Sequence, residues 1–170
     1  MMDVEIVPCS PEYLEKLIEG GDAFLKAYGL PVVDGYLPSE FIGVLQHSQS
    51  EIKASQIWYP WLCYLFLFRP EQVFVGFGGF KSVPDDNRTV EIGYSVAPSY
   101  QNKGVATSAT KQLIENAIAS NAVDCVCAHT LAEPNASTRV LKKCGMTKVS
   151  ESIDPEDREV WKWEIWSDYQ

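Results

Sequence analysis

The sequence has little of several features that mark particular classes of protein. It holds only two histidines and five cysteines in 170 residues, and neither type is spaced to hold a metal ion. The longest apolar run, at 61–68, has eight residues, whereas a membrane-spanning helix needs roughly 20. Basic residues are scarce too, because 14 Lys and Arg stand against 23 Asp and Glu and give a net charge of −9. We therefore expect no metal, no membrane span and no nucleic-acid partner, while cationic partners remain open.

The rest of the composition is typical of an ordinary globular protein. With 46% hydrophobic and 22% charged residues, the chain is expected to fold as one domain over residues 1–170. The number of cysteines is odd and no secretory segment precedes them, which predicts reduced, buried thiols in a cytoplasmic protein. These cysteines are Cys9, Cys63, Cys125, Cys127 and Cys144.

Hydrophobic patterning predicts a strand followed by a mainly helical segment. Alternating residues over 3–8 are typical of a strand, and Ser10-Pro11-Glu12 is typical of a helix start, with a stop at Gly20-Gly21. Repeated glycines and prolines predict an irregular arm over 22–38, and a second helix is expected near 40–49.

Three β-rich runs come next and predict an antiparallel meander. They cover 61–68, 73–80 and 89–96 and are separated by turn residues. Gly76-Phe77-Gly78-Gly79 lies inside the second run with no helix after it, so we interpret these glycines as close strand packing or a bulge, not as a nucleotide loop. Periodicity then predicts a helix from Gly104 to about 120, a strand at 123–130, a helix at 135–144 and a strand at 159–166. The expected order is β-α-α-β-β-β-α-β-α-β.

The loop before the third predicted helix has the composition of an anion site. A helix start carries unpaired N–H groups and a partial positive charge, and Gly104 and Ala106 leave room for a phosphate to approach. The Gln101-x-x-Gly104-x-Ala106 spacing is short, however, and an ordinary tight turn would have it as well.

The distribution of charge strengthens the interpretation of that loop as an anion site. Residues 98–114 and 134–149 contain basic residues and no acid, although the chain as a whole is acidic. Both stretches lie at predicted helix starts, so they favour a site for a polyanion, and a solvated basic face is the alternative. Their basic residues are Lys103, Lys111, Arg139, Lys142, Lys143 and Lys148.

Two segments resemble a known family. The run EIGYSVAPSYQNKGVAT at 91–107 is similar to the acetyl-CoA-binding motif of the GNAT N-acetyltransferases. The run HTLAEPNASTRVL at 129–141, together with Gly145-Met146, resembles the ribosomal-protein (RimJ/RimL-like) branch of that family. The resemblance is good over residues 60–150 and generic before them.

The resemblance implies an α/β (α+β) fold with a mixed, mostly antiparallel sheet whose fourth and fifth strands splay apart. Acetyl-CoA would be the co-substrate: its pantetheine arm would pair with the strand edge at Val96, and its pyrophosphate would sit on N–H groups of the loop and helix start. The cofactor-binding residues expected from the resemblance are Val96, Gln101, Asn102, Lys103, Gly104, Val105, Ala106, Thr107 and Asn135.

The implied reaction is transfer of an acetyl group to a primary amine by direct attack in a ternary complex. The amine would be a protein N-terminus or a small cationic molecule. Glu91 is expected to remove the ammonium proton, as a carboxylate near this place often does in the family. A surface glutamate paired with Arg88 or Lys81 is the alternative. Backbone N–H groups near Val96 would stabilise negative charge on the carbonyl oxygen.

The sequence departs from the family pattern at the expected proton donor for the leaving thiolate. Many family members have a tyrosine at the position of Leu141, and Ser137, one turn earlier, is our substitute. Helix capping by Asn135 or Ser137 is an alternative role, and water is an alternative acid.

Two aromatic residues predict where the acceptor amine binds. Tyr36 and Trp58 lie in loop contexts and are expected to line a substrate cleft, although core packing is the commoner fate of such residues. The competing function is a non-catalytic acyl-CoA-binding module or sensor, and a nucleic-acid-modifying protein is a weaker third class. The family habit also suggests a homodimer.

Overall fold

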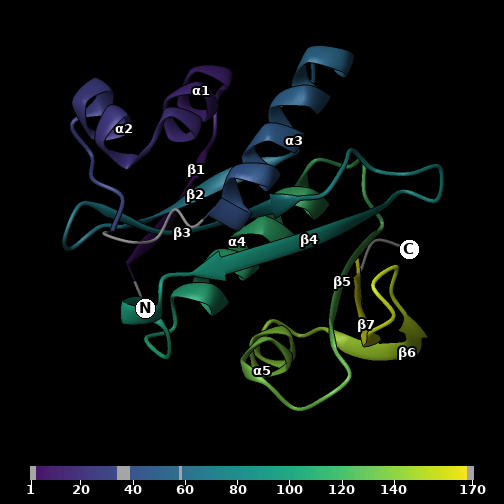
Figure 1. The fold of residues 1–170 in the computed structure, drawn as a ribbon. Coiled ribbons are helices and arrows are strands. Elements are labelled where there is room, and N and C mark those ends of the chain that lie inside the picture. The colour runs from purple at the N-terminus through teal and green to yellow at the C-terminus, as the bar shows by residue number, and fades with distance from the viewer. Residues whose placement is uncertain (1–2, 34–38, 58, 168–170) are drawn as a thin grey trace.

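The computed structural model describes residues 3–33, 39–57 and 59–167, and one seven-stranded sheet runs through this described part (Figure 1). The strand order is β1-β2-β3-β4-β5-β7-β6, and every neighbouring pair is antiparallel except β4 with β5. This confirms the predicted mixed, mostly antiparallel sheet. The strands are β1 (Val4–Pro8), β2 (Cys63–Phe68), β3 (Val73–Phe80), β4 (Thr89–Val96), β5 (Cys125–Leu131), β6 (Thr147–Ile153) and β7 (Glu159–Trp166).

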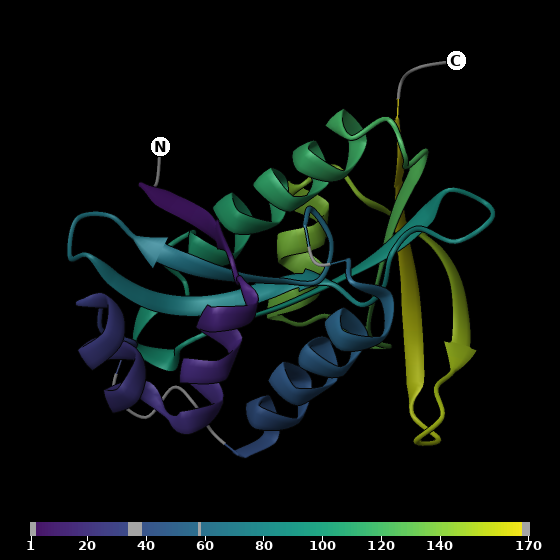
Figure 2. The ribbon, with the colours of Figure 1, turned by 90° about the horizontal axis from the view of Figure 1, so that it is seen from above.

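Helices cover both faces of the sheet, as Figure 2 shows from above. On one face lie α1 (Pro11–Glu19), α2 (Gly21–Tyr28) and α3 (Ser39–Ser55). On the other lie α4 (Val105–Ala119) and α5 (Ala136–Lys143), and a 3-10 turn at Pro98–Tyr100 joins β4 to the loop before α4. Within the described residues, no helix is long and apolar enough to cross a bilayer.

The predicted irregular arm over 22–38 is wrong in its first part, because α2 occupies Gly21–Tyr28. Its aromatic residues supply the reason: Phe24 is fully buried, and the rings of Phe24 and Tyr28 lie 5.1 and 4.4 Å from the ring of Tyr13 on α1. Gly29, at a φ of 69°, ends the helix in the left-handed conformation that glycine adopts without strain. Tertiary packing therefore overrides the local breakers.

Two further elements differ from prediction. The helix expected near 40–49 is α3, which extends to Ser55, and Leu45, Ser48 and Ile52 continue one inward face along it. The strand β6 was not predicted at all. Every residue of β6 is exposed, so it shows no buried alternation, and its backbone pairing with β7 holds it in the sheet.

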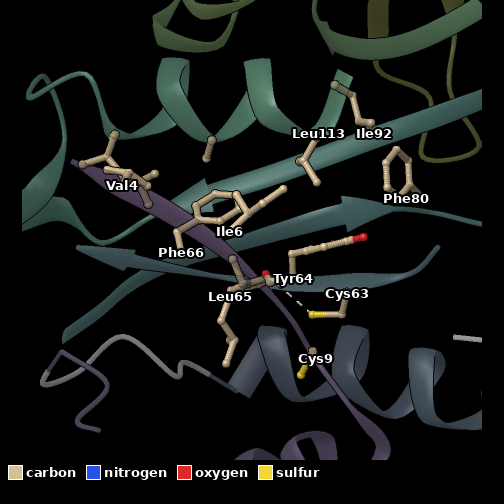
Figure 3. Packing of buried hydrophobic residues seen from close by; sticks show 14 of the residues in the cluster. Val4, Ile6, Cys9, Cys63, Tyr64, Leu65, Phe66, Phe80, Ile92 and Leu113 are labelled. Atoms are coloured by element: carbon tan, nitrogen blue, oxygen red, sulfur yellow. Dashed lines mark hydrogen bonds between the residues drawn. The ribbon is translucent and has the colours of Figure 1, made fainter. Parts of the chain in front are cut away.

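The core lies between the sheet and the helices of both faces. Figure 3 shows side chains of β1, β2, β4 and α4 meeting there, with Ile6, Phe66, Ile92 and Leu113 among them. Each of these four is less than a tenth exposed. Burial on this scale stabilises each large apolar side chain by about 1.5–3 kcal/mol.

The glycines of β3 allow neighbouring strands to approach closely. A Cβ built on Gly76 would lie 2.6 Å from the carbonyl oxygen of Ser95, and one on Gly79 would lie 1.9 Å from that of Leu62. Neither position has room for a side chain, which confirms the interpretation of these glycines as a packing feature.

Strands β4 and β5 pair only briefly. Their register pairs residues 89, 90 and 91 with 125, 126 and 127, so Glu91 opposite Cys127 is the last pair. Beyond it the described parts of the two strands separate, as Figure 1 shows. This is the predicted splay, and it leaves the edge of β4 open.

Candidate functional site

Strand β4 divides its residues between the two sides of the sheet. The N–H of Lys81 donates to the carbonyl of Glu91, and the N–H of Ala97 donates to that of Val75. Since backbone direction alternates along a strand, odd-numbered residues turn their backbone groups toward β3 and Tyr94 and Val96 turn theirs toward the open edge. Side chains alternate between faces too, so those at 91, 93 and 95 share the α3 side while Ile92 packs toward α4.

A cavity of about 370 Å³ lies on the α4 side, between β4, the start of α4 and α5. Seven of the nine residues predicted to bind the cofactor line it. Lys103 and Asn135 are not among its lining residues. The seven are Val96, Gln101, Asn102, Gly104, Val105, Ala106 and Thr107.

The start of α4 faces this cavity with free backbone donors. Gly104 is the N-cap residue, at a φ of 85° that favours glycine, and no side chain caps the helix. The first intrahelical bond is from the N–H of Ser108 to the carbonyl of Gly104, so the amides of 105–107 remain for an anion. At the other end of the loop, Gln101 Nε2 donates to the carbonyl of Val96 at 3.0 Å and ties the loop to β4.

The basic residues of the two acid-free segments gather only in part. Arg139 and Lys143 of α5 line the cavity. Lys103 instead places its ammonium 4.7 Å from the centre of the Tyr100 ring, and Lys148 pairs with Glu151 on the β6 side. Of the six basic residues from which a polyanion site was predicted, two therefore line the cavity.

Glu91 lies where β4 and β5 separate, and it forms an ion pair with Lys81, the residue after β3, and a hydrogen bond with His129 of β5. His129 Nδ1 is 2.9 Å from Glu91 Oε1, and the Glu91 side chain is 25% exposed. Burial alone would raise the pKa of Glu91, but the hydrogen bonds from Lys81 and His129 outweigh it and lower the pKa. The carboxylate therefore stays ionised at neutral pH. The predicted alternative of a pair with Lys81 is present, whereas Arg88 pairs with Asp124.

The Glu91 side chain opens into a second cavity, of about 650 Å³, whose wall also includes His129, Asn135 and Ser137. Ser137 lines the α4-side cavity as well, so the two cavities meet at the start of α5. The side chain of Asn135 accepts from the N–H of Thr138 at 2.9 Å, and Thr138 Oγ1 accepts from the N–H of Asn135. Asn135 is thus the N-cap of α5, as the alternative role proposed for it requires.

Two residues at this junction were missed from the sequence. Tyr94 lines the α4-side cavity, and its hydroxyl is 3.4 Å from the Ser137 carbonyl. Burial raises the pKa of Tyr94, so its phenol stays protonated. His129 was the second. The alternation that puts Cys125 and Cys127 on one face of a strand puts His129 there too, but only the parallel register of β4 and β5 brings its side chain to Glu91.

A third cavity, of about 580 Å³, lies on the α3 side against β3 and β4. The residues predicted to line an acceptor cleft, Tyr36 and Trp58, lie outside the described part of the chain. The structure therefore leaves that prediction untested.

The cysteines are all free and buried, which confirms the predicted core thiols. Burial raises the pKa of Cys144 to about 11, so this thiol is unreactive at neutral pH although its Sγ lies 3.7 Å from the carbonyl of Thr107. No group of three or more His, Cys, Asp or Glu side chains among the described residues could hold a metal ion.

Comparison with known families identifies the family and the fold. A family model described as an acetyltransferase (GNAT) domain matches residues 20–147. The chain belongs to the GNAT acetyltransferase family. The family predicted from residues 91–107 and 129–141 is therefore confirmed, and with it acetyl-CoA as the co-substrate.

Solved structures share the GNAT fold over nearly the whole chain, at low sequence identity. RimL, a ribosomal alpha-N-protein acetyltransferase solved with coenzyme A, is 17% identical, with a TM-score of 0.71 over 98% of this chain and 96% of its own. A ribosomal-protein alanine acetyltransferase from Vibrio fischeri is 13% identical, with a TM-score of 0.70 over 99% and 96%. The microcin self-immunity acetyltransferase MccE, solved with acetyl-CoA and AMP, is 16% identical, with a TM-score of 0.67 over 96% and 92%. Among curated proteins, none matches the chain.

The residues of the α4-side cavity fit the co-substrate of this GNAT protein. The uncapped amides of α4 suit a diphosphate, and Arg139 and Lys143 supply positive charge beside them. The backbone groups of Tyr94 and the N–H of Val96 at the open strand edge suit the amides of a pantetheine arm, while the Val96 carbonyl already accepts from Gln101.

Proposed function

We propose that this GNAT acetyltransferase transfers the acetyl group of acetyl-CoA to a primary amine that enters from the α3 side of the sheet. The observation that carries the proposal is the separation of β4 and β5 directly after Glu91. Through that separation, the cavity for the co-substrate meets the cavity that holds the carboxylate, with Ser137 on the wall of both. An amine and a thioester can therefore meet without a covalent enzyme intermediate.

Glu91 is proposed to hold the incoming ammonium and to accept its proton, directly or through water. Acetyl-CoA supplies the activated acetyl group, the amine nitrogen forms the new bond to the acetyl carbon, and the sulfur leaves with the electron pair of the broken bond. The lowered pKa of Glu91 keeps it as a carboxylate that attracts a cation. His129, hydrogen-bonded to the same carboxylate oxygen, holds it in place and is within reach of the released proton.

The leaving sulfur needs a proton, and two hydroxyls lie where the cavities meet. Ser137 keeps the role predicted for it, and Tyr94 is a second candidate because its protonated phenol lies beside Ser137. Leu141 occupies the position where many family members have a tyrosine, and it is buried. Backbone N–H groups at the open edge near Val96 would stabilise negative charge on the carbonyl oxygen.

The test is the release of free thiol from acetyl-CoA across a panel of small amines and peptide N-termini. Glu91→Gln should lower kcat/KM by about 100-fold or more, as the loss of a general base does, with the affinity for CoA unchanged. Glu164→Gln is the matched control, because Glu164 also lies on a strand and pairs with a lysine, Lys162, but stands outside the three cavities. Unchanged turnover in Glu91→Gln would remove this residue from the mechanism.

A non-catalytic acyl-CoA-binding module is the second candidate. Two observations favour it: Leu141 replaces the usual acid, and Lys81 already neutralises Glu91. The same panel separates the two functions, since a binding module would bind CoA with measurable heat and release no thiol with any amine.

A further inference from the structure

The walls of the cavity on the α3 side are mostly apolar. Phe41 and Val44 of α3 line it from one side and Phe77 of β3 from the other, and the rings of Phe41 and Phe77 meet edge to face at 4.3 Å. Among the described residues that line it, none is Asp or Glu. A polyamine, whose second and third charges need carboxylates, would find no partner on these walls.

Two glycines on the same walls leave space that the fold does not require. A Cβ added to Gly43 or to Gly93 would meet nothing within 4 Å, and neither has a positive φ. In this they differ from Gly76 and Gly79, where a Cβ would collide with backbone. Gly43 lies inside a helix, where glycine is less favourable than alanine by roughly 1 kcal/mol. Among the described residues, the space beside Gly43 is thus part of the open cavity.

The apolar cavity borders the cavity that holds Glu91. Lys81 lines both this cavity and the one that holds Glu91, and it pairs with Glu91 itself. Gly93 and Ser95 share the Glu91 face of β4 and line the apolar cavity. A molecule whose amine meets Glu91 can thus place the carbon skeleton behind that amine between α3 and β3.

We propose that the acceptor is a primary amine on an apolar body, aromatic or branched aliphatic, with no second positive charge, and that the α3-side cavity holds that body. The inference rests on the proposed function and deepens it. The net charge of −9 attracts amines in general. Selection among them comes from the apolar area that the cavity removes from water.

The first experiment compares ethylamine, n-hexylamine, 2-phenylethylamine and spermidine as acceptors with saturating acetyl-CoA. Burial of a phenyl-sized group should raise kcat/KM for 2-phenylethylamine at least about 30-fold above that for ethylamine. Spermidine, which is longer but carries additional charges, should stay below n-hexylamine. In parallel, calorimetry measures binding of 2-phenylethylamine to the protein saturated with CoA.

The second experiment changes one wall of the cavity. Val44→Glu places a carboxylate on the cavity side of α3, at a residue already 47% exposed, so the fold should tolerate it. The ratio of kcat/KM for 2-phenylethylamine over spermidine should fall at least tenfold. Ala54→Glu is the matched control, because Ala54 lies exposed on the same helix and lines none of the cavities. Its ratio should stay within twofold of the unchanged protein.

The outcomes separate this inference from the proposed function. Turnover of amines with no preference for the apolar body, or equal effects of the two glutamates, would overturn the inference and leave acetyl transfer standing. Binding of 2-phenylethylamine without turnover would support the cavity as the binding site of the apolar body and would overturn the proposed acetyl transfer. Neither binding nor turnover would overturn both.

Discussion

Replacing Gly104 by glutamate tests whether the α4 amides hold the diphosphate of CoA. Gly104 and Gly145 share a φ of 85°, and both are exposed. A non-glycine residue in this conformation costs about 1–2 kcal/mol, so Gly104→Glu and Gly145→Glu should lose similar stability. In a chain of this length that strain lowers Tm by about 2–8 °C. The control therefore carries the same backbone penalty away from the cofactor cavity.

Only Gly104→Glu should also weaken CoA binding. Two unit charges about 4 Å apart repel by about 1 kcal/mol in water and about 4 kcal/mol near a protein surface. A carboxylate added beside a diphosphate should thus cost at least about 2 kcal/mol, or about 30-fold in Kd. Calorimetric titration with CoA at about 0.1 M salt measures this, and raising the salt should restore part of the affinity. If both folded variants bind CoA as tightly as the unchanged protein, the diphosphate does not sit on these amides.

Four further substitutions test the chemistry and the core. In Lys81→Met, burial still raises the pKa of Glu91 while the contact that lowers this pKa most is lost, so the acid limb of kcat/KM should move to higher pH. The variant should also have a lower Tm near pH 7. A lowered carboxyl pKa stabilises the fold above the unfolded pKa and loses this effect as pH falls, so the difference in Tm should vanish in acid. The kcat values of Tyr94→Phe and Ser137→Ala identify the proton donor. The variant that lacks the donor should have a kcat lower by about tenfold or more, with the KM for acetyl-CoA unchanged, and an unchanged kcat in both variants would indicate that water donates the proton. Thr110→Val should stabilise the protein by about 1 kcal/mol, measured in urea, because Thr110 Oγ1 is buried in the described structure with no hydrogen-bond partner; a destabilised variant would contradict this.

The part of the site that could be predicted from the sequence is the part built from contiguous residues. The run from Glu91 to Thr107 contains the strand edge, the loop and the helix start, so its local spacing already fixes how Gly104 and the amides after it face an anion. The contacts of Glu91 are different, because His129 reaches it only through the parallel register of β4 and β5 and Lys81 only through the antiparallel register of β3 and β4. No local pattern encodes a pairing between distant strands.

The missed elements have the same kind of cause. The helix α2 looks broken in isolation, and it forms because Phe24 and Tyr28 find Tyr13 on α1. The strand β6 buries no side chain and is held by backbone bonds to β7, so hydrophobic alternation had nothing to detect. Hydrophobic periodicity identifies an element that buries one of its own faces. It fails for an element that forms only because a neighbouring element packs against it or pairs with it.

The register of β4 links the α3-side and α4-side cavities to a single strand. Odd-numbered residues place Glu91 and Gly93 on the α3 side, and even-numbered residues turn the backbone of Val96 toward the α4-side cavity. A slip of one residue would exchange the two sets and turn the carboxylate to the wrong face of the sheet. A Cβ on Gly78 would lie 2.6 Å from the carbonyl oxygen of Gly93, so β3 and β4 approach this closely only because the β3 residue is glycine. On the proposed mechanism, the pairing of β3 with β4 therefore decides which face of the gap receives the base.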